Sequence, residues 1–322
     1  MTPTIRRATV DDLRGMADLL LRDAEQRRAL DSVLWAVAPD AKARIEAAVS
    51  SGLRGAKGAP PELWLLAEVS GRMVGIAHAM SVPVPPIYGV KTGPPGLFLD
   101  DCFTTPDAPA ATAEALLAAT EGALRDMGAS TLIASCPAAG PWRPLYAGNG
   151  YEPVTLYLAK HGFRTHRPAV GVRPAGPGDI PGIVRLSADH RRILSTLNPR
   201  FWPLRPDADS RFEGWMRYSL TLKDRDMIVS AALDVVHGYI IDQPVSALHL
   251  PAAHDVRAIG MIDDFYDGDF ANIPAVSSGG AAAAALLAAA ESALAGRSYA
   301  AALAVCPAAW TSKAQVRHDE RP

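Results

Sequence analysis

The nine residues LLAATEGAL at positions 116–124 recur as LLAAAESAL at positions 286–294, a shift of 170 residues along the chain. At the same shift, the tetrapeptide CPAA occurs at positions 136–139 and again at 306–309. Chance does not readily produce two separate matches at one constant offset, and a long repeat period indicates a structural module that is present twice. A module of about 160 residues, with one core in each half of the chain, therefore decides the fold.

The length and the composition allow two such cores. The chain has 322 residues, 49% of them hydrophobic and 20% charged, and a single core stops growing at roughly 250–300 residues. The net charge of −2 and the scattered basic residues provide no cationic surface for nucleic acid. No apolar leader precedes Asp11 and Asp12, and no uninterrupted apolar stretch reaches about 18 residues. We therefore expect a cytoplasmic protein with neither a nucleic-acid nor a membrane partner.

The three cysteines are too few for a disulfide framework, and their spacing matches no zinc site. Cys136 and Cys306 recur at equivalent ends of expected strands. Free cysteine commonly packs as a small hydrophobic residue, so we expect both in the core and expect no metal. A catalytic nucleophile is the alternative, but the sequence places no base nearby.

Each copy is expected to begin with a short strand and a helix start. Residues 5–13 correspond to residues 172–180 at a shift of 167, and Thr9 and Asp12 match a capping box. A hairpin follows at residues 63–79 in the first copy, because two apolar runs flank a Ser-Gly-Arg turn. Its counterpart begins at residue 227.

The second half of each copy is expected to contain a strand, a long helix and another strand. In the first copy these are residues 97–103, 113–127 and 131–136, and the first copy continues with a short helix at 142–148 and a final strand at 154–159. The corresponding long helix, residues 281–295, begins with an alanine run that alternatively indicates low complexity. This element order predicts an α/β or α+β fold with a mixed sheet.

The segment LYAGNGYEP at residues 145–153 looks like the L-Y-x-x-x-G-F/Y signature of the GNAT superfamily of acyl-CoA-dependent N-acyltransferases. With the element order, the chain resembles two GNAT-like folds in tandem, over about residues 5–160 and 172–310. The resemblance implies an N-acetyltransferase that moves an acetyl group from acetyl-CoA to a primary amine of a small-molecule or peptide acceptor. It implies no metal.

In that family the strand before the long helix separates from its neighbour, pantetheine fills the gap, and amides at the helix N-terminus hold the pyrophosphate. The resemblance implies that pantetheine faces Cys102, Phe103 and Thr104. The family's Q/R-x-x-G-x-G/A loop falls on Ala108, Ala111 and Ala113, so the arginine or glutamine is absent and one glycine is alanine. Asn149 is a further cofactor-binding candidate.

The resemblance also assigns catalytic candidates. Tyr146 matches the family's frequent general acid, and a core tyrosine is the alternative. The general base is expected among three acidic residues on strands, namely Asp100, Asp101 and Glu68. Alternation along a strand would place Asp100 and Asp101 on opposite faces, so only one of them would line the acceptor cleft. Because this pair recurs at Asp263 and Asp264, a shared structural role is equally open.

Other residues that often carry chemistry receive structural assignments. A lone histidine on a strand is more often a packing or surface residue, so neither His78 nor His237 is assigned a catalytic role. The tryptophans Trp202, Trp215 and Trp310 are expected in the core or at an interface.

The two copies are not equivalent. The shift of 170 residues carries Tyr146 to Val316, and it carries the final strand beyond Pro322. We therefore predict a catalytic domain at residues 1–162, a linker at 163–171, and a degenerate domain at 172–322 that lacks its last strand. The second domain would pack on the first, shape the acceptor cleft or form a homodimer. The alternative function is a non-catalytic tandem module that binds acyl-CoA or a protein partner.

Overall fold

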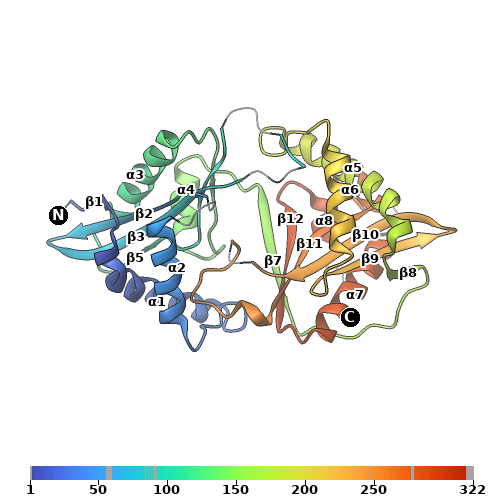
Figure 1. Cartoon of the computed structure of the whole chain (residues 1–322), viewed down its shortest axis with the longest axis horizontal. Helices are drawn as coiled ribbons and strands as arrows, with labels where there is room; N and C mark the ends of the chain where they lie inside the picture. Colours follow the sequence, from blue (N-terminus) through green and yellow to red (C-terminus); the bar gives the residue numbers. More distant parts are fainter. Residues whose placement is uncertain are drawn as a thin grey trace. The chain divides into compact units, whose positions relative to one another are not determined.

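The structure, a computed structural model, describes residues 2–55, 60–83, 85, 87–89, 93–246, 248–276 and 279–316. Residues 317–322, the end of the expected second domain, lie outside the described residues. The chain forms two compact units, each built on its own mixed six-stranded sheet (Figure 1). The α/β fold class and the two-module organisation expected from the repeat are confirmed.

The first unit comprises Met1–Val84, Val90–Glu152 and Ser246–Asp255. Its strands are β1 (Thr4–Arg7), β2 (Glu62–Val69), β3 (Arg72–Ser81), β4 (Gly96–Phe98), β5 (Phe103–Thr104) and β6 (Leu132–Ala134). Its helices are α1 (Leu13–Leu30), α2 (Ala41–Arg54), α3 (Thr112–Asp126) and α4 (Trp142–Gly148). The strand order is β1-β2-β3-β4-β6, with β5 paired to β3, and only the β4–β6 pair within this sheet is parallel.

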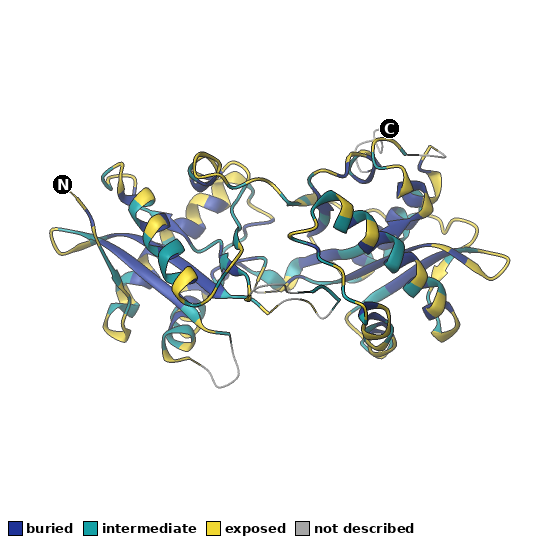
Figure 2. Ribbon diagram, turned by 90° about the horizontal axis from the view of Figure 1, so that it is seen from above, coloured by how far each residue is buried: buried dark blue, intermediate teal, exposed yellow. Residues whose placement is uncertain are grey.

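Both faces of the first sheet are covered by helices. Trp64 and Leu66 of β2 pack on the side of α1 and α2, whereas Leu63 and Leu65 pack with α3 and α4. Successive strand residues point to opposite faces, which explains why β2 is a nearly continuous apolar run. In Figure 2 the strands are mostly buried, and the helices have one buried and one exposed side.

The capping box predicted before α1 is present. The backbone N–H of Thr9 donates to Asp12 Oδ2 at 2.8 Å, and the Thr9 hydroxyl lies 3.0 Å from the same oxygen. These contacts satisfy groups that a helix start leaves unpaired, so the local sequence fixes where the chain turns from β1 into the helix.

The strand expected at residues 97–103 is interrupted. β4 pairs with β3 and with β6 up to Phe98, and pairing with β3 resumes only at Phe103 in β5. Residues 99–102 between them form an irregular bulge, anchored by the Leu99 N–H, which donates to the His78 carbonyl at 3.0 Å. Because β6 follows β4 only to Ala134, the sheet opens beyond this point.

The second unit comprises Pro85–Gly89, Pro153–Val245 and Val256–Pro322. Its strands are β7 (Thr155–His161), β8 (Val172–Pro174), β9 (Asp226–Ala232), β10 (Val235–Pro244), β11 (Ile259–Asp267) and β12 (Ala301–Pro307). Its helices are α5 (Ile180–Leu197), α6 (Ala208–Ser219), α7 (Ala281–Gly296) and α8 (Thr311–Gln315). The strand order is β7-β12-β11-β10-β9-β8. The alanine run of α7 is regular helix, which excludes the low-complexity alternative.

The predicted domain boundary is wrong at β7. This strand was expected to close the first sheet, but it pairs antiparallel with β12 along its whole length, for example Leu158 with Ala304. The second unit therefore begins at Pro153, and its sheet has the last strand that the sequence comparison found missing. An unpaired edge of β12 would leave backbone groups unsatisfied, and β7 satisfies them.

Two loops also belong to the unit formed mainly by the other half of the chain. Residues 246–255 lie in the first unit, where the Ala38 N–H donates to the Ala253 carbonyl at 2.9 Å. Residues 85–89 lie in the second, where the Gly89 N–H donates to the Pro203 carbonyl at 2.8 Å. Each loop follows the second strand of its hairpin, so the exchange is reciprocal. No helix within the described residues is long and apolar enough to cross a membrane.

Candidate functional site

The opening between β4 and β6 contains a cavity of about 140 Å³ in the first unit. One wall comes from α1, another from the bulge after β4, and the third from the loop between β6 and α4. The residues that line it are Asp23, Gln26, Arg27, Leu30, Asp100, Cys102, Ser135, Cys136, Pro137, Ala139, Gly140, Pro141 and Trp142. Parallel strands that separate in this way leave backbone and side chains free to surround a ligand.

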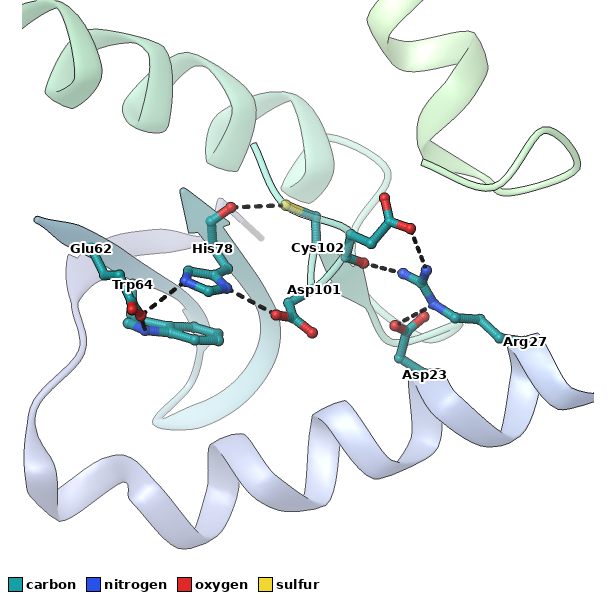
Figure 3. Close-up of polar contacts among 8 residues, drawn as sticks. Asp23, Arg27, Glu62, Trp64, His78, Asp101 and Cys102 are labelled. Atoms are coloured by element: carbon teal, nitrogen blue, oxygen red, sulfur yellow. Dashed lines mark hydrogen bonds and ion pairs between the residues drawn. The ribbon is translucent and has the colours of Figure 1, made fainter. Parts of the chain in front are cut away.

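A buried arginine joins two carboxylates in this cavity. Arg27, which is 5% exposed, donates from Nε to Asp23 Oδ2 at 2.8 Å and from Nη1 to Asp100 Oδ2 at 3.3 Å. Its Nη2 also donates to the Asp100 carbonyl, so the guanidinium is fixed against the bulge (Figure 3). The guanidinium carbon lies 5.3 Å from the centre of the Trp35 ring, a cation–π distance.

The two carboxylates have unusual acidity. Burial raises the pKa of Asp23 to about 7, against the opposing effect of Arg27, and the neighbouring Asp100 and Asp101 raise it further. Burial also raises the pKa of Asp100, and its Oδ1 is buried without a hydrogen-bond partner among the described residues. A carboxylate with a pKa near neutrality changes its protonation state at the pH where amines must lose a proton, which suits a general base.

Asp101 points to a different partner. His78 Nδ1 lies 2.9 Å from Asp101 Oδ2, and its Nε2 lies 3.2 Å from Glu62 Oε2 (Figure 3). The ring stacks on Trp64 with centroids 3.6 Å apart. Burial lowers the pKa of His78, but the hydrogen bonds to the two carboxylates outweigh this effect and leave the pKa raised. His78 is therefore a cation that holds Asp101, a role beyond the packing or surface role expected for it.

The exchanged loop adds a second histidine to the first unit. His254, 1% exposed, lies with Nδ1 3.1 Å from the Trp35 carbonyl, and its Nε2 has no hydrogen-bond partner in the described part of the chain. Burial, with the nearby Arg27 charge, lowers the pKa of His254 to about 4, so the ring is neutral at pH 7. Because a neutral ring facing a carbonyl carries its proton on Nδ1, Nε2 is left as an acceptor.

The predicted general acid, Tyr146, lies beside the cavity in the core. It is 4% exposed, packs against Phe98, Trp142 and Tyr151, and its hydroxyl has no hydrogen-bond partner among the described residues. Burial raises its pKa well above the usual value, and the nearby Cys102 thiol adds to the effect. The hydroxyl therefore keeps its proton and lies close to a residue that lines the cavity.

Of the other predicted cofactor residues, Cys102 lines the cavity, whereas Phe103 packs on the α1 and α2 side of the sheet. Thr104 pairs with Gly75. Asn149 donates from Nδ2 to the Leu145 carbonyl at 2.9 Å and so caps the end of α4. These positions are compatible with a structural role for all but Cys102.

The predicted pyrophosphate loop leads into α3. Ala111 is exposed at the helix start, whereas Ala108 and Ala113 pack partly against the core. Asp107 in this loop pairs with Arg72 at 2.6 Å. The helix start supplies amides and a favourable dipole for an anion, but the loop itself adds an acidic side chain.

Glu68, the third candidate base, does not line this cavity. It forms an ion pair with Arg6 at 2.5 Å near the start of β1, and Arg6 also binds Asp12. This contact ties β2 to the capping box before α1 and accounts for Glu68 as a structural residue.

The equivalent region of the second unit is filled. At the shift of 170 residues, Gly140 in the cavity wall corresponds to Trp310, which is 0% exposed. The indole packs edge-on against Tyr266, Phe270 and His190, and it donates to the Ser312 hydroxyl at 3.0 Å. Trp310 was expected in the core or at an interface, and it lies in the core. A large aromatic side chain thus replaces the open space next to glycine, which is consistent with a degenerate second copy.

Sequence reasoning missed Asp23 and Arg27. The available signal was an acidic and a basic residue four positions apart on the apolar face of α1, between Leu20 and the helix end. Charged residues on a buried face are seldom found without a partner. Their partner, the bulge at Asp100, becomes evident only from the fold. Within the described residues, no group of three or more His, Cys, Asp or Glu side chains is arranged to hold a metal ion.

Neither protein-family models nor curated proteins match this chain. Among solved structures, a tandem GNAT protein from the clavulanic acid biosynthesis pathway is similar over 95% of this chain and 90% of its own, with 14% identity and a TM-score of 0.47. A probable N-acyltransferase of unknown function from Enterococcus faecalis V583 is similar over 95% of this chain and 65% of its own, at 13% identity and a TM-score of 0.43.

A single-module protein is also similar. A predicted acetyltransferase from Clostridium acetobutylicum, solved with acetyl-CoA, aligns with 47% of this chain and 90% of its own, at 18% identity and a TM-score of 0.36. These similarities concern the fold alone. The element order and the two mixed sheets described above are those of two GNAT-like folds in tandem.

Proposed function

We propose that the chain is an acetyl-CoA-dependent N-acetyltransferase whose active site lies in the first unit. The observation that carries the proposal is the cavity at the opening between β4 and β6, lined on one side by the acidic pair Asp23 and Asp100 and on the other by Cys102 and Cys136. The thioester end of the cosubstrate would enter this opening, and the amine would approach from the α1 side. The proposed location is the cytoplasm.

The reaction requires an amine without its extra proton. Asp23 or Asp100 would accept that proton, because both line the cavity and have a raised pKa. The nitrogen then bonds to the acetyl carbon, the carbon–sulfur bond breaks, and the departing thiolate takes a proton, for which Tyr146 is the proposed donor. Arg27 would hold the two carboxylates in position.

The proposed acceptor is a primary amine on a small molecule or a peptide. Two carboxylates with one arginine give the cavity an acidic character, which favours the approach of a cationic ammonium group. A nucleic-acid partner is not proposed, and homodimer formation stays a prediction.

Titration calorimetry with acetyl-CoA tests the proposal. We expect micromolar binding to the unaltered protein and at least a tenfold loss in Cys136→Phe, because the half-buried Cys136 lines the cavity and phenylalanine would fill it. The matched control is Ala138→Phe, an exposed neighbour outside the cavity lining. No heat up to millimolar acetyl-CoA would rule out the transferase.

A second candidate is a tandem module that binds acyl-CoA without turnover. The burial of Tyr146, which is absent from the cavity lining, favours this alternative. A thiol-release assay with a panel of primary amines separates the two functions. A transferase releases CoA with an amine present, and Tyr146→Phe slows this release with little change in acetyl-CoA affinity, whereas a binding module releases none with any amine.

A further inference from the structure

The second unit contains a larger cavity that lies away from the opening between its parallel strands. Its volume is about 430 Å³, and it is enclosed by α7, by β8 and β9, by the segment after α6 and by residues 166–169. This volume is within the range of small-molecule sites and equals that of roughly 14 water molecules at about 30 Å³ each. An empty void of this size would cost a large share of a domain's stability, so solvent or a ligand must fill it.

The cavity exists because one face of α7 is made of small residues. Ala285, Ala288, Ala289, Ser292 and Ala293 line it, at spacings of three and four residues that bring them onto one face of the helix. The opposite wall includes larger apolar side chains, such as Met227 and Ile228 of β9. Most of the wall is therefore apolar.

One cation in this wall has an unused donor. Arg225 donates from Nη1 to the Ser219 hydroxyl at 2.8 Å, and its guanidinium carbon lies 5.7 Å from the centre of the Trp215 ring. Its Nε is buried and has no hydrogen-bond partner among the described residues. A buried N–H without an acceptor is unfavourable, and an arginine edge matches the two oxygens of a carboxylate.

The acidic groups near Arg225 have other partners. Asp226, also in the wall, accepts from Arg297 Nε at 2.6 Å. Asp263 is close enough for Arg225 to lower its pKa, but burial and Asp264 dominate and raise that pKa to about 6. Asp263 does not line the cavity, so it does not occupy the position of a ligand's anionic group.

The linker closes the cavity on the side of α7. The His166 N–H donates to the Ser292 hydroxyl at 2.8 Å, and its Nε2 lies 3.1 Å from Glu291 Oε2. Lys160 also bonds to Glu291. The segment that the sequence presented as a polar connection is thus fixed over an apolar space.

We propose that this cavity binds a small amphipathic carboxylate, such as a medium-chain fatty acid, with its carboxylate on Arg225 and its apolar body along the alanine face of α7. The site is separate from the proposed transferase site, and it does not depend on the proposed function. Other anions lack the apolar body that the alanine face would cover.

Titration with sodium octanoate, monitored by calorimetry and by protein NMR, tests the proposal. We expect saturable one-to-one binding that weakens at least tenfold in Arg225→Gln and in Ala289→Phe, and weaker binding of 1-octanol, which lacks the charge. The controls Arg192→Gln and Ala282→Phe replace exposed residues outside the cavity and should bind octanoate normally. Thermal unfolding checks that each variant is folded, and Ala285→Leu replaces Ala289→Phe if that variant is not.

Two results would overturn the proposal. One is the lack of saturable binding up to millimolar octanoate. The other is unchanged binding in both Arg225→Gln and the filled variant, and displacement by acetyl-CoA would then assign the octanoate to the first unit.

Discussion

Arg27 is the residue on which the acidic cavity of the first unit depends. It is buried with Asp23 and Asp100, and its three nitrogens all bond to these two residues. Two carboxylates in so small a space repel each other, and burial removes the water that would otherwise screen them. The arginine compensates both effects, so its own removal leaves negative charge buried without a partner.

Arg27→Met should therefore destabilise the protein by about 3–5 kcal/mol, the usual cost of breaking a buried ion pair from one side. The loss should be smaller at pH 5 than at pH 8, because Asp23 with a pKa of about 7 is protonated at the lower pH. Urea unfolding at both pH values measures this. Arg28→Met is the control, since Arg28 is an exposed partner of Glu25, and a change below about 0.5 kcal/mol is expected there.

Asp242 of β10 gives a second pH dependence, in the other unit. It is 0% exposed, and burial together with Asp226 raises its pKa to about 8. Between about pH 4 and pH 8 the folded state holds a proton that the unfolded chain has lost, so the free energy of unfolding falls as the pH rises through this window. Asp242→Asn keeps the shape and removes the titration.

We expect Asp242→Asn to gain stability over the unaltered protein progressively from pH 5 to pH 9. Urea unfolding at pH 5, 7 and 9 measures the difference. Asp224→Asn, at an exposed position, should parallel the unaltered protein throughout. A constant difference across this range would mean that Asp242 is ionised in the folded state.

At the residue scale, the sequence identified the acidic bulge but not its partners. Asp100 and Asp101 stood out because they recur and interrupt an apolar strand. Their different surroundings, Arg27 for one and His78 for the other, depend on which side chains from α1 and β3 reach the bulge. Such contacts join residues 73 and 23 positions apart, and no local pattern encodes them.

At the scale of elements, β7 joins its sheet at the edge of β12. Its partners along the strand run from Thr155 with Pro307 to His161 with Ala301. Strand pairing makes the backbone hydrogen bonds of β7 part of the second unit's cooperative structure, even though the sequence repeat assigns this strand to the first copy.

Native-state hydrogen exchange in low urea tests this pairing. Amides of β7 that bond to β12 should open with the free energy measured for β12 amides. Amides of β6 and α4 serve as the comparison, because they immediately precede β7 in the chain but lie in the first unit. If β7 amides followed those of β6, the assignment of the strand would be wrong.

Local patterns predicted most elements but not their partners. The hairpin at residues 63–79 and the helices at 113–127 and 281–295 appear within about three residues of the expected bounds, because apolar periodicity and turn residues act locally. α2 and α6 were missed, and β4 and β5 were expected as one strand. The break between them is a tertiary feature, since it follows from pairing to β3 on both sides of the bulge.

At the scale of the whole molecule, each unit is completed by chain from the other repeat. The first includes residues 246–255, and the second includes residues 85–89 and β7. His254 illustrates the importance of this exchange, because its buried ring contacts Trp35 and lies near Arg27 in the first unit.

A fragment of residues 1–162, cut at the boundary that the repeat predicts, should therefore be less stable than the first unit of the full chain. It lacks residues 246–255, and its β7 has no β12 to pair with. Urea unfolding followed by Trp64 fluorescence, with Trp35, Trp142 and the second-unit tryptophans replaced by phenylalanine, measures the difference. Equal stability would show that the exchanged loop adds nothing.

The exchanged loop also constrains the order of events during synthesis. The first unit reaches its full set of contacts only after residue 255 of 322 has left the ribosome, when most of the second repeat has already been translated. A nascent chain that has just released residues 1–152 has its sheet but not His254, so we expect it to wait in a partly closed state. Translation speed across residues 153–245 would then set how long that state is exposed to chaperones and proteases.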